Sequence, residues 1–162
     1  MVTTRAARTS DADAIQRLTA QLGYDVEPSQ LRARLSSLIA RPDHLFIVAC
    51  DGEPAVGWLH ATVAEYIETG PFVVVGGLVV DSRRRGEGIG RLLLDEAEAW
   101  ARQRGCSIVR LWSSVARAGA HRFYERAGYT NIKTQYSFVK CLDPAGEAGL
   151  RAFVPRVDEE PH

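Results

Sequence analysis

The chain has 162 residues, of which 46% are hydrophobic and 25% are charged, and its 20 Lys and Arg residues balance 20 Asp and Glu residues. This length suits one domain that buries about 70% of the unfolded chain's surface, so stability requires neither disulfides nor a metal. The neutral total charge excludes a wholly basic nucleic-acid-binding protein, and the ordinary hydrophobic content excludes a disordered chain. The longest apolar run, residues 72–80, is far shorter than the roughly 20 residues that span a bilayer.

The N-terminus and the cysteines indicate a reduced protein of the cytoplasm. Residues 1–5 lack the hydrophobic core of a signal peptide. Three cysteines, Cys50, Cys106 and Cys141, are odd in number and far apart in the sequence. Since no His or second Cys stands at metal-ligand or redox spacing from them, we expect no metal site.

Hydrophobic periodicity predicts one mixed α/β domain over residues 1–142, followed by a loose tail over 143–162 that is rich in Pro, Gly and Glu. The expected elements in chain order are a strand over 3–8, a helix over 9–23, a helix from 28 to before Pro42, strands over 45–50 and 55–64 with a turn at Asp51-Gly52, a strand over 72–80, a helix over 89–105, a strand over 107–112, a short helix closed by Gly128, and one or two strands over 129–142. This order predicts a mixed sheet with helices on both faces. Gly76 and Gly77 interrupt the apolar strand over 72–80 and predict a bulge or a close approach to the backbone.

The loop over residues 81–91 indicates an anion site. Gly86, Gly88 and Gly90 stand at every second position just before the longest amphipathic helix, so backbone N–H groups and the helix N-terminus can face a phosphate. Residues 83–91 contain four Arg and one Glu, a local charge of +3 in a neutral chain. The spacing excludes a P-loop, which needs Gly-Lys-Ser or Gly-Lys-Thr, and a dinucleotide fingerprint, which needs a small residue where Arg91 stands.

The sequence Arg85-Gly86-Glu87-Gly88-Ile89-Gly90, after Leu78-Val79-Val80-Asp81 and well before Phe123-Tyr124-Glu125-Arg126-Ala127-Gly128-Tyr129, resembles the GCN5-related N-acetyltransferase (GNAT) family over residues 3–142. Residues 114–128 are similar to bacterial members described as aminoglycoside 6'-acetyltransferase-like. The resemblance implies a mixed, mostly antiparallel sheet whose central strand splays from the strand after the long helix.

The resemblance also implies acetyl-CoA as co-substrate and a homodimer by analogy. The pantetheine arm would lie on the central strand edge, the pyrophosphate on the glycine loop, and Arg117, which replaces an Asn common in the family, near a CoA phosphate. The implied cofactor-binding residues are Leu78, Val79, Val80, Arg85, Gly86, Glu87, Gly88, Ile89, Gly90, Arg91 and Arg117.

For catalysis, the family pattern implies direct acetyl transfer to an amine, with a backbone N–H near Val79 or Val80 for the oxyanion and Tyr124 as proton donor to the thiolate. Glu65 and Glu68 are the candidates for the base. Trp112, Ser114 and Tyr136 would line the acceptor side. Trp112 also stands where N-terminal acetyltransferases carry a glutamate, which disfavours a peptide N-terminus.

Two other functions stay open. A non-catalytic acyl-CoA-binding sensor would keep the glycine loop without needing Tyr124 as an acid. A nucleic-acid-binding protein would need basic charge spread along a face, whereas here it is confined to one loop. The acceptor, a small molecule or a peptide amine, cannot be derived from these residues, because one fold hosts many substrates.

Overall fold

The computed structural model describes residues 1–153, and its chain divides into two compact units, residues 1–112 and 113–162. The first unit contains β1 (Thr3–Ala6), α1 (Ala12–Gln21), α2 (Pro28–Ile39), β2 (His44–Cys50), β3 (Ala55–Tyr66), β4 (Gly70–Val80), α3 (Ile89–Gln103) and β5 (Val109–Leu111), with short 3-10 turns at Thr9–Asp11 and Ser82–Arg84. The described part of the second unit contains α4 (Ala118–Arg126), α5 (Pro144–Gly149) and a 3-10 turn at Leu150–Phe153.

One five-stranded sheet with the order β1-β2-β3-β4-β5 forms the first unit's centre. Neighbouring strands are antiparallel except for β4 and β5, which run parallel. The long crossover through α3 makes that parallel pairing possible, because parallel strands cannot be joined by a tight turn. The expected mixed, mostly antiparallel sheet is therefore confirmed.

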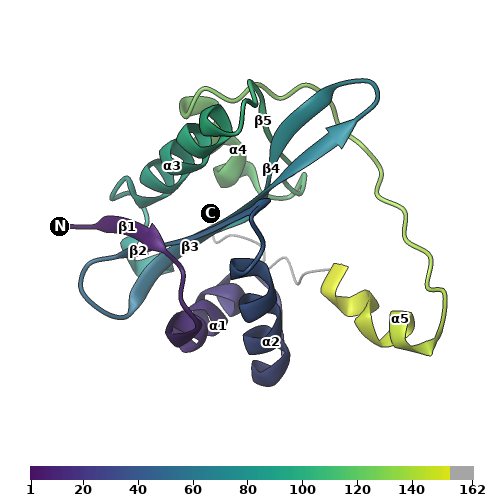
Figure 1. Cartoon of the computed structure of the whole chain (residues 1–162), viewed down its shortest axis with the longest axis horizontal. Helices are drawn as coiled ribbons and strands as arrows, with labels where there is room; N and C mark the ends of the chain where they lie inside the picture. Colours follow the sequence, from purple (N-terminus) through teal and green to yellow (C-terminus); the bar gives the residue numbers. More distant parts are fainter. Residues whose placement is uncertain (154–162) are drawn as a thin grey trace. The chain divides into compact units, whose positions relative to one another are not determined.

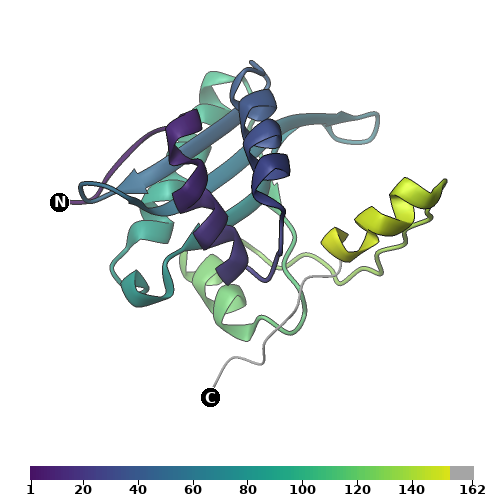
Figure 2. The same ribbon diagram turned by 90° about the horizontal axis from the view of Figure 1, so that it is seen from below.

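Helices cover both faces of this sheet, with α1 and α2 on one face and α3 on the other (Figures 1 and 2). Leu18 of α1 and Leu35 of α2 are buried with Trp58 of β3 on the first face. On the α3 face, Gly57 leaves room for the helix, since a Cβ there would lie 3.3 Å from Leu93 Cδ1. Burial of these apolar stripes is the main source of stability.

The expectation of one or two strands over residues 129–142 is wrong for this structure, in which the segment has no regular secondary structure. Its apolar side chains satisfy a strand pattern, but Tyr136 and Phe138 are 91% and 92% exposed. A strand needs a hydrogen-bonded neighbour, and none pairs with this segment among residues 1–153.

The predicted loose tail begins instead with the helix α5, whose N-cap Asp143 accepts a hydrogen bond from the N–H of Gly146 at 2.8 Å. Residues 154–162 of that tail lie outside the described residues. Within residues 1–153, none of the helices is long and apolar enough to cross a membrane.

Candidate active site

The open edge of β4 is the first feature of the site. β5 pairs with β4 only from Val73↔Val109 to Val75↔Leu111, whereas β4 continues to Val80. Beyond Val75 the side of β4 that faces β5 has no strand partner among the described residues. This early end of the pairing agrees with the splayed strand pair that the family resemblance implies.

A bulge at Gly76 sets which backbone groups face this open edge. The register places His60 opposite Gly77 and Ala61 opposite Val75, so Gly76 is the extra residue. Farther along, the N–H of Asp81 donates to the carbonyl of Val56 at 2.8 Å.

Because backbone groups alternate along an antiparallel strand, this bond fixes the direction of the N–H groups near the end of β4. Asp81 and Val79 direct theirs to β3. Leu78 and Val80 direct theirs to the open edge.

The loop after β4 is held by Asp81, which is 2% exposed. Its carboxylate accepts from the backbone N–H of Arg83 at 3.1 Å and from the Arg83 guanidinium at 3.1 and 2.9 Å. These hydrogen bonds keep the pKa of Asp81 far below its usual range. Gly86 and Gly88 have φ values of 82° and 81°, a left-handed conformation that L side chains rarely adopt, and Gly88 is the N-cap of α3.

Ion pairs occupy three of the four arginines in this loop. Besides Arg83, Arg84 Nε lies 2.8 Å from Glu87 Oε2 and its Nη2 lies 3.1 Å from Asp51 Oδ2. Arg91 Nε lies 2.7 Å from Asp95 Oδ1. Arg85 is exposed and has no ion pair in the described part of the chain. The positive charge that the loop can offer to an anion is therefore smaller than the +3 counted from the sequence. Arg85 is the residue that provides this charge.

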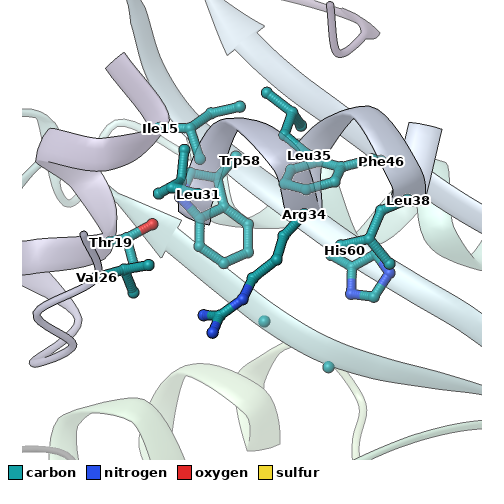
Figure 3. Close-up of a pocket in the computed structure, with 12 residues that line it drawn as sticks. Ile15, Thr19, Val26, Leu31, Arg34, Leu35, Leu38, Phe46, Trp58 and His60 are labelled. Atoms are coloured by element: carbon teal, nitrogen blue, oxygen red, sulfur yellow. The ribbon is translucent and has the colours of Figure 1, made fainter. Parts of the chain in front are cut away.

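A cavity of about 210 Å³ lies next to the bulge at Gly76, on the face of the sheet that α1 and α2 cover (Figure 3). Four residues of α2 spaced as i, i+3, i+4 and i+7 line it, namely Leu31, Arg34, Leu35 and Leu38. Phe46 and Trp58 form an aromatic wall, and Gly76 and Gly77 bring the β4 backbone to the cavity. The cavity is thus apolar apart from a few polar groups, as small-molecule sites usually are.

Two histidines connect the cavity to the protein surface. His60 lines the cavity, and its Nδ1 would lie 3.4 Å from a Cβ at Gly76. Its Nε2 lies 2.8 Å from His44 Nδ1, and His44 Nε2 lies 3.8 Å from Asp43 Oδ2. Burial, and to a smaller degree the charge of His44, lower the pKa of His60 to about 4. His60 is therefore neutral at pH 7, and it is a weaker base than an ordinary histidine.

In the second unit, Tyr124 lies on α4, and its ring contacts those of Phe123 and Tyr129 at 5.1 and 6.0 Å. Burial raises the pKa of its phenol, although the charge of Arg117 opposes this. The hydroxyl therefore keeps its proton at neutral pH. Arg117 is the N-cap residue of the same helix.

The remaining predicted residues of the first unit, Glu65, Glu68 and Trp112, are not among the residues that line the cavity. Glu65 pairs with Pro71 near the end of the β3–β4 hairpin, Glu68 lies in the hairpin turn, and both are exposed. Trp112 follows β5, is 54% exposed and lies under the guanidinium of Arg110 at 4.9 Å. In the second unit, the carbonyl oxygen of Ser114 lies 2.9 Å from His121 Nε2. The exposed Tyr136 ring lies beside that of Phe138.

The sequence analysis assigned no role to Arg34 and His60, which line the cavity, or to His44, whose Nδ1 lies 2.8 Å from His60 Nε2. Phe46, Trp58 and His60 lie on one face of the sheet because a register shift at Ala49/Cys50 places Phe46 opposite His60, which the turn at Asp51-Gly52 alone does not predict. Arg34 stands within the apolar stripe of α2, where a charged residue is unexpected.

Comparisons with known proteins agree with this architecture. The family model described as "Acetyltransferase (GNAT) family" matches residues 12–129. The aminoalkylphosphonate N-acetyltransferase of Salmonella typhimurium is 29% identical over 140 residues, which cover 85% of this chain and 90% of that protein. The aminoglycoside N(6')-acetyltransferase type 1 of Klebsiella aerogenes is 31% identical over 118 residues, which cover 70% and 77%. The apo crystal structure of an aminoglycoside 6'-N-acetyltransferase from Acinetobacter haemolyticus has the same fold, with a TM-score of 0.76, 19% identity, and coverage of 87% of this chain and 99% of the other.

Proposed function

The chain belongs to the GNAT family of acetyltransferases, and from this premise we propose that it transfers the acetyl group of acetyl-CoA to the primary amine of a small molecule. The observation that carries the proposal is the continuity of the open edge of β4 with the glycine loop and the N-terminus of α3. The relatives named for aminoalkylphosphonate and aminoglycoside acetylation support a small-molecule acceptor over a peptide.

The open edge and the loop suit the two polar parts of acetyl-CoA. The N–H groups of Leu78 and Val80 point to the edge where amides of the pantetheine arm would add like a strand. The pyrophosphate would lie on the N–H groups of residues 85–91, where Gly86 and Gly88 leave the backbone uncovered, since a Cβ at either would meet nothing within 4 Å. Arg85 supplies the free charge at this position, and Arg117 is a second proposed phosphate contact.

In the proposed reaction, the neutral amine nitrogen attacks the thioester carbonyl carbon, the new N–C bond forms, and the C–S bond breaks. The negative charge on the carbonyl oxygen would be stabilised by a backbone N–H at the open edge. From the alternation of β4 we assign this role to Leu78 or Val80 rather than to Val79, whose N–H is directed to β3. The Tyr124 hydroxyl protonates the departing thiolate, and its raised pKa means that it still holds its proton at neutral pH before that step.

The proton that the amine loses needs an acceptor, and we propose His60. Accepting it on Nδ1 requires the tautomer in which Nε2–H donates to His44 Nδ1, and the proton can then pass through His44 toward Asp43. Glu65 and Glu68 are the alternative, although both lie outside the cavity lining. The kcat of His60→Gln, Glu65→Gln and Glu68→Gln separates these candidates, because the variant with the lower kcat identifies the base.

The deciding experiment measures free-thiol release from acetyl-CoA against a panel of amines. Tyr124→Phe should lower kcat by about 100-fold and leave CoA affinity unchanged, since the hydroxyl acts only on the leaving group. Tyr129→Phe, which changes the neighbouring ring in the same unit, is the control. Wild-type protein that binds acetyl-CoA and acetylates no amine would favour the non-catalytic sensor.

The cytoplasm remains the expected location, and a homodimer remains an expectation from the family. Sedimentation of the purified protein tests the dimer directly.

A further inference from the structure

The cavity on the α1–α2 face has one charged side chain among the residues that line it, the guanidinium of Arg34. The lining contains no Asp or Glu, and the polar groups that accompany Arg34 are those of Thr19, His60 and Trp58. The electrostatic character of the cavity is therefore cationic, in a chain whose total charge is zero.

Arg34 is free to bind a ligand. It is exposed at the cavity and has no ion pair within residues 1–153, whereas its neighbour on the same helix, Arg32, lies 2.6 Å from Asp13 Oδ1. Figure 3 shows the Arg34 side chain extending from α2 past the Trp58 ring, with its guanidinium in front of the sheet. A planar guanidinium without a partner matches the two oxygens of a carboxylate, phosphonate or phosphate.

The other residues that line the cavity indicate the size and polarity of the rest of the ligand. Leu31, Leu35, Leu38 and Phe46 offer apolar surface, and the indole N–H of Trp58 is buried without an acceptor among the described residues. At about 210 Å³ the cavity suits a compact molecule rather than an oligosaccharide. A polycationic ligand would meet Arg34 and find no carboxylate on the lining.

We propose that the acceptor is a compact primary amine that carries an apolar body and an anionic group, and that Arg34 binds the anionic group. This inference rests on the proposed function and narrows its substrate class. The apolar body would lie against Phe46 and Trp58, and the amine would lie at the β4 bulge beside His60 Nδ1. Polycationic aminoglycosides are excluded as the preferred acceptor by the same charge arrangement.

Four probes test the inference. Phenylethylamine, phenylalanine and the phosphonate analogue of phenylalanine share one body and differ in the anionic group, and kanamycin is the polycation. Calorimetric binding in the presence of CoA is measured beside thiol release with acetyl-CoA, for the wild type, Arg34→Ala, Arg34→Lys and the control Arg32→Ala.

The expected result is that wild type and Arg32→Ala bind one or both anionic amines at least tenfold more tightly than phenylethylamine or kanamycin. Arg34→Ala should lose about ten- to hundredfold in that affinity, with no change for phenylethylamine, and Arg34→Lys should restore part of it. The two anionic arms distinguish a carboxylate from a phosphonate.

The proposal is overturned if wild type binds kanamycin or phenylethylamine as well as the anionic amines, if it binds no anionic amine, or if Arg34→Ala binds them unchanged. Anionic amines that bind through Arg34 without being acetylated would support Arg34 as the anion-binding residue and would contradict the proposed acetyl transfer to them, so the two failures are distinguishable.

Discussion

Replacing His60 by Gln should remove a large part of the dependence of stability on acid pH. His60 faces His44 from β2 and Gly76 from β4, and Arg34 of α2 lines the same cavity. Burial holds the pKa of His60 at about 4 in the folded protein, against 6.5 for an ordinary histidine. Above pH 6.5 the ring is neutral in both the folded and the unfolded chain. Between pH 6.5 and pH 4 the unfolded chain takes up a proton that the folded protein does not, so the free energy of unfolding falls as pH falls.

The size of this effect follows from the shift, since one pKa unit equals about 1.4 kcal/mol. For His60 the fall between pH 6.5 and pH 4 is at most about 3 kcal/mol, and partial solvent contact of the ring reduces it. Urea unfolding followed by circular dichroism at half-unit steps from pH 8 to pH 4.5 measures the free energy of unfolding for wild type and His60→Gln. The difference in the free energy of unfolding between wild type and His60→Gln should be constant above pH 7. Below pH 7 the wild type should lose more of its free energy of unfolding than the variant does.

The variant His44→Gln separates the two causes of the shift. It removes the neighbouring charge of His44 and leaves His60 buried. The fall in the free energy of unfolding toward acid pH should therefore become smaller without disappearing, because burial is the larger cause of the pKa shift. Equal slopes for wild type and His60→Gln between pH 7 and pH 4.5 would refute the reasoning.

Two further substitutions test the role of Arg85 in the glycine loop and the packing of Gly77 against Trp58. Arg85→Ala should weaken CoA binding about tenfold in calorimetry, because it removes the unpaired charge of the loop. The control Arg102→Ala, at the other end of α3, should leave the affinity for CoA unchanged. Equal affinities of the two variants for CoA would contradict the role of Arg85. Gly77→Ala should lower the free energy of unfolding by about 1–3 kcal/mol in urea, since the new Cβ would lie 2.6 Å from Trp58 Cζ3 and Cη2, and an unchanged midpoint would show that the indole moves aside freely.

Local patterns in the sequence were sufficient for most of the fold. The bulge at the Gly76-Gly77 pair and the glycine loop before α3 depend on neighbouring residues, and the structure contains both. The strands over 45–50 and 55–64 are also joined at Asp51-Gly52, although the connection spans residues 51–54 rather than a two-residue turn. The segment 129–142 shows the limit of such patterns. Alternating apolar residues favour a strand, but pairing depends on an edge supplied from elsewhere in the fold.

The part of the candidate site that lies in one continuous stretch of sequence, residues 78–91, could be outlined from local patterns, and its role in binding the co-substrate stays a prediction. The partner of Arg84, Asp51, comes from the β2–β3 connection, so the cancellation of the loop's charge depends on tertiary structure. The cavity likewise requires α2 and the register of β2 with β3 to bring Arg34, His44 and His60 to one face. No spacing rule in the sequence reports such a convergence.

If acetyl-CoA binds at the edge that the short pairing of β5 with β4 leaves open, the co-substrate becomes a structural component of the fold. Exposed strand edges invite aggregation, and here the missing neighbour of Leu78–Val80 would be an acetyl-CoA molecule rather than polypeptide. A ligand that binds only the folded state at 100 times its Kd adds about 2.7 kcal/mol of stability. Bound acetyl-CoA would then raise the free energy of unfolding, so the folded protein would be more stable when its co-substrate is abundant.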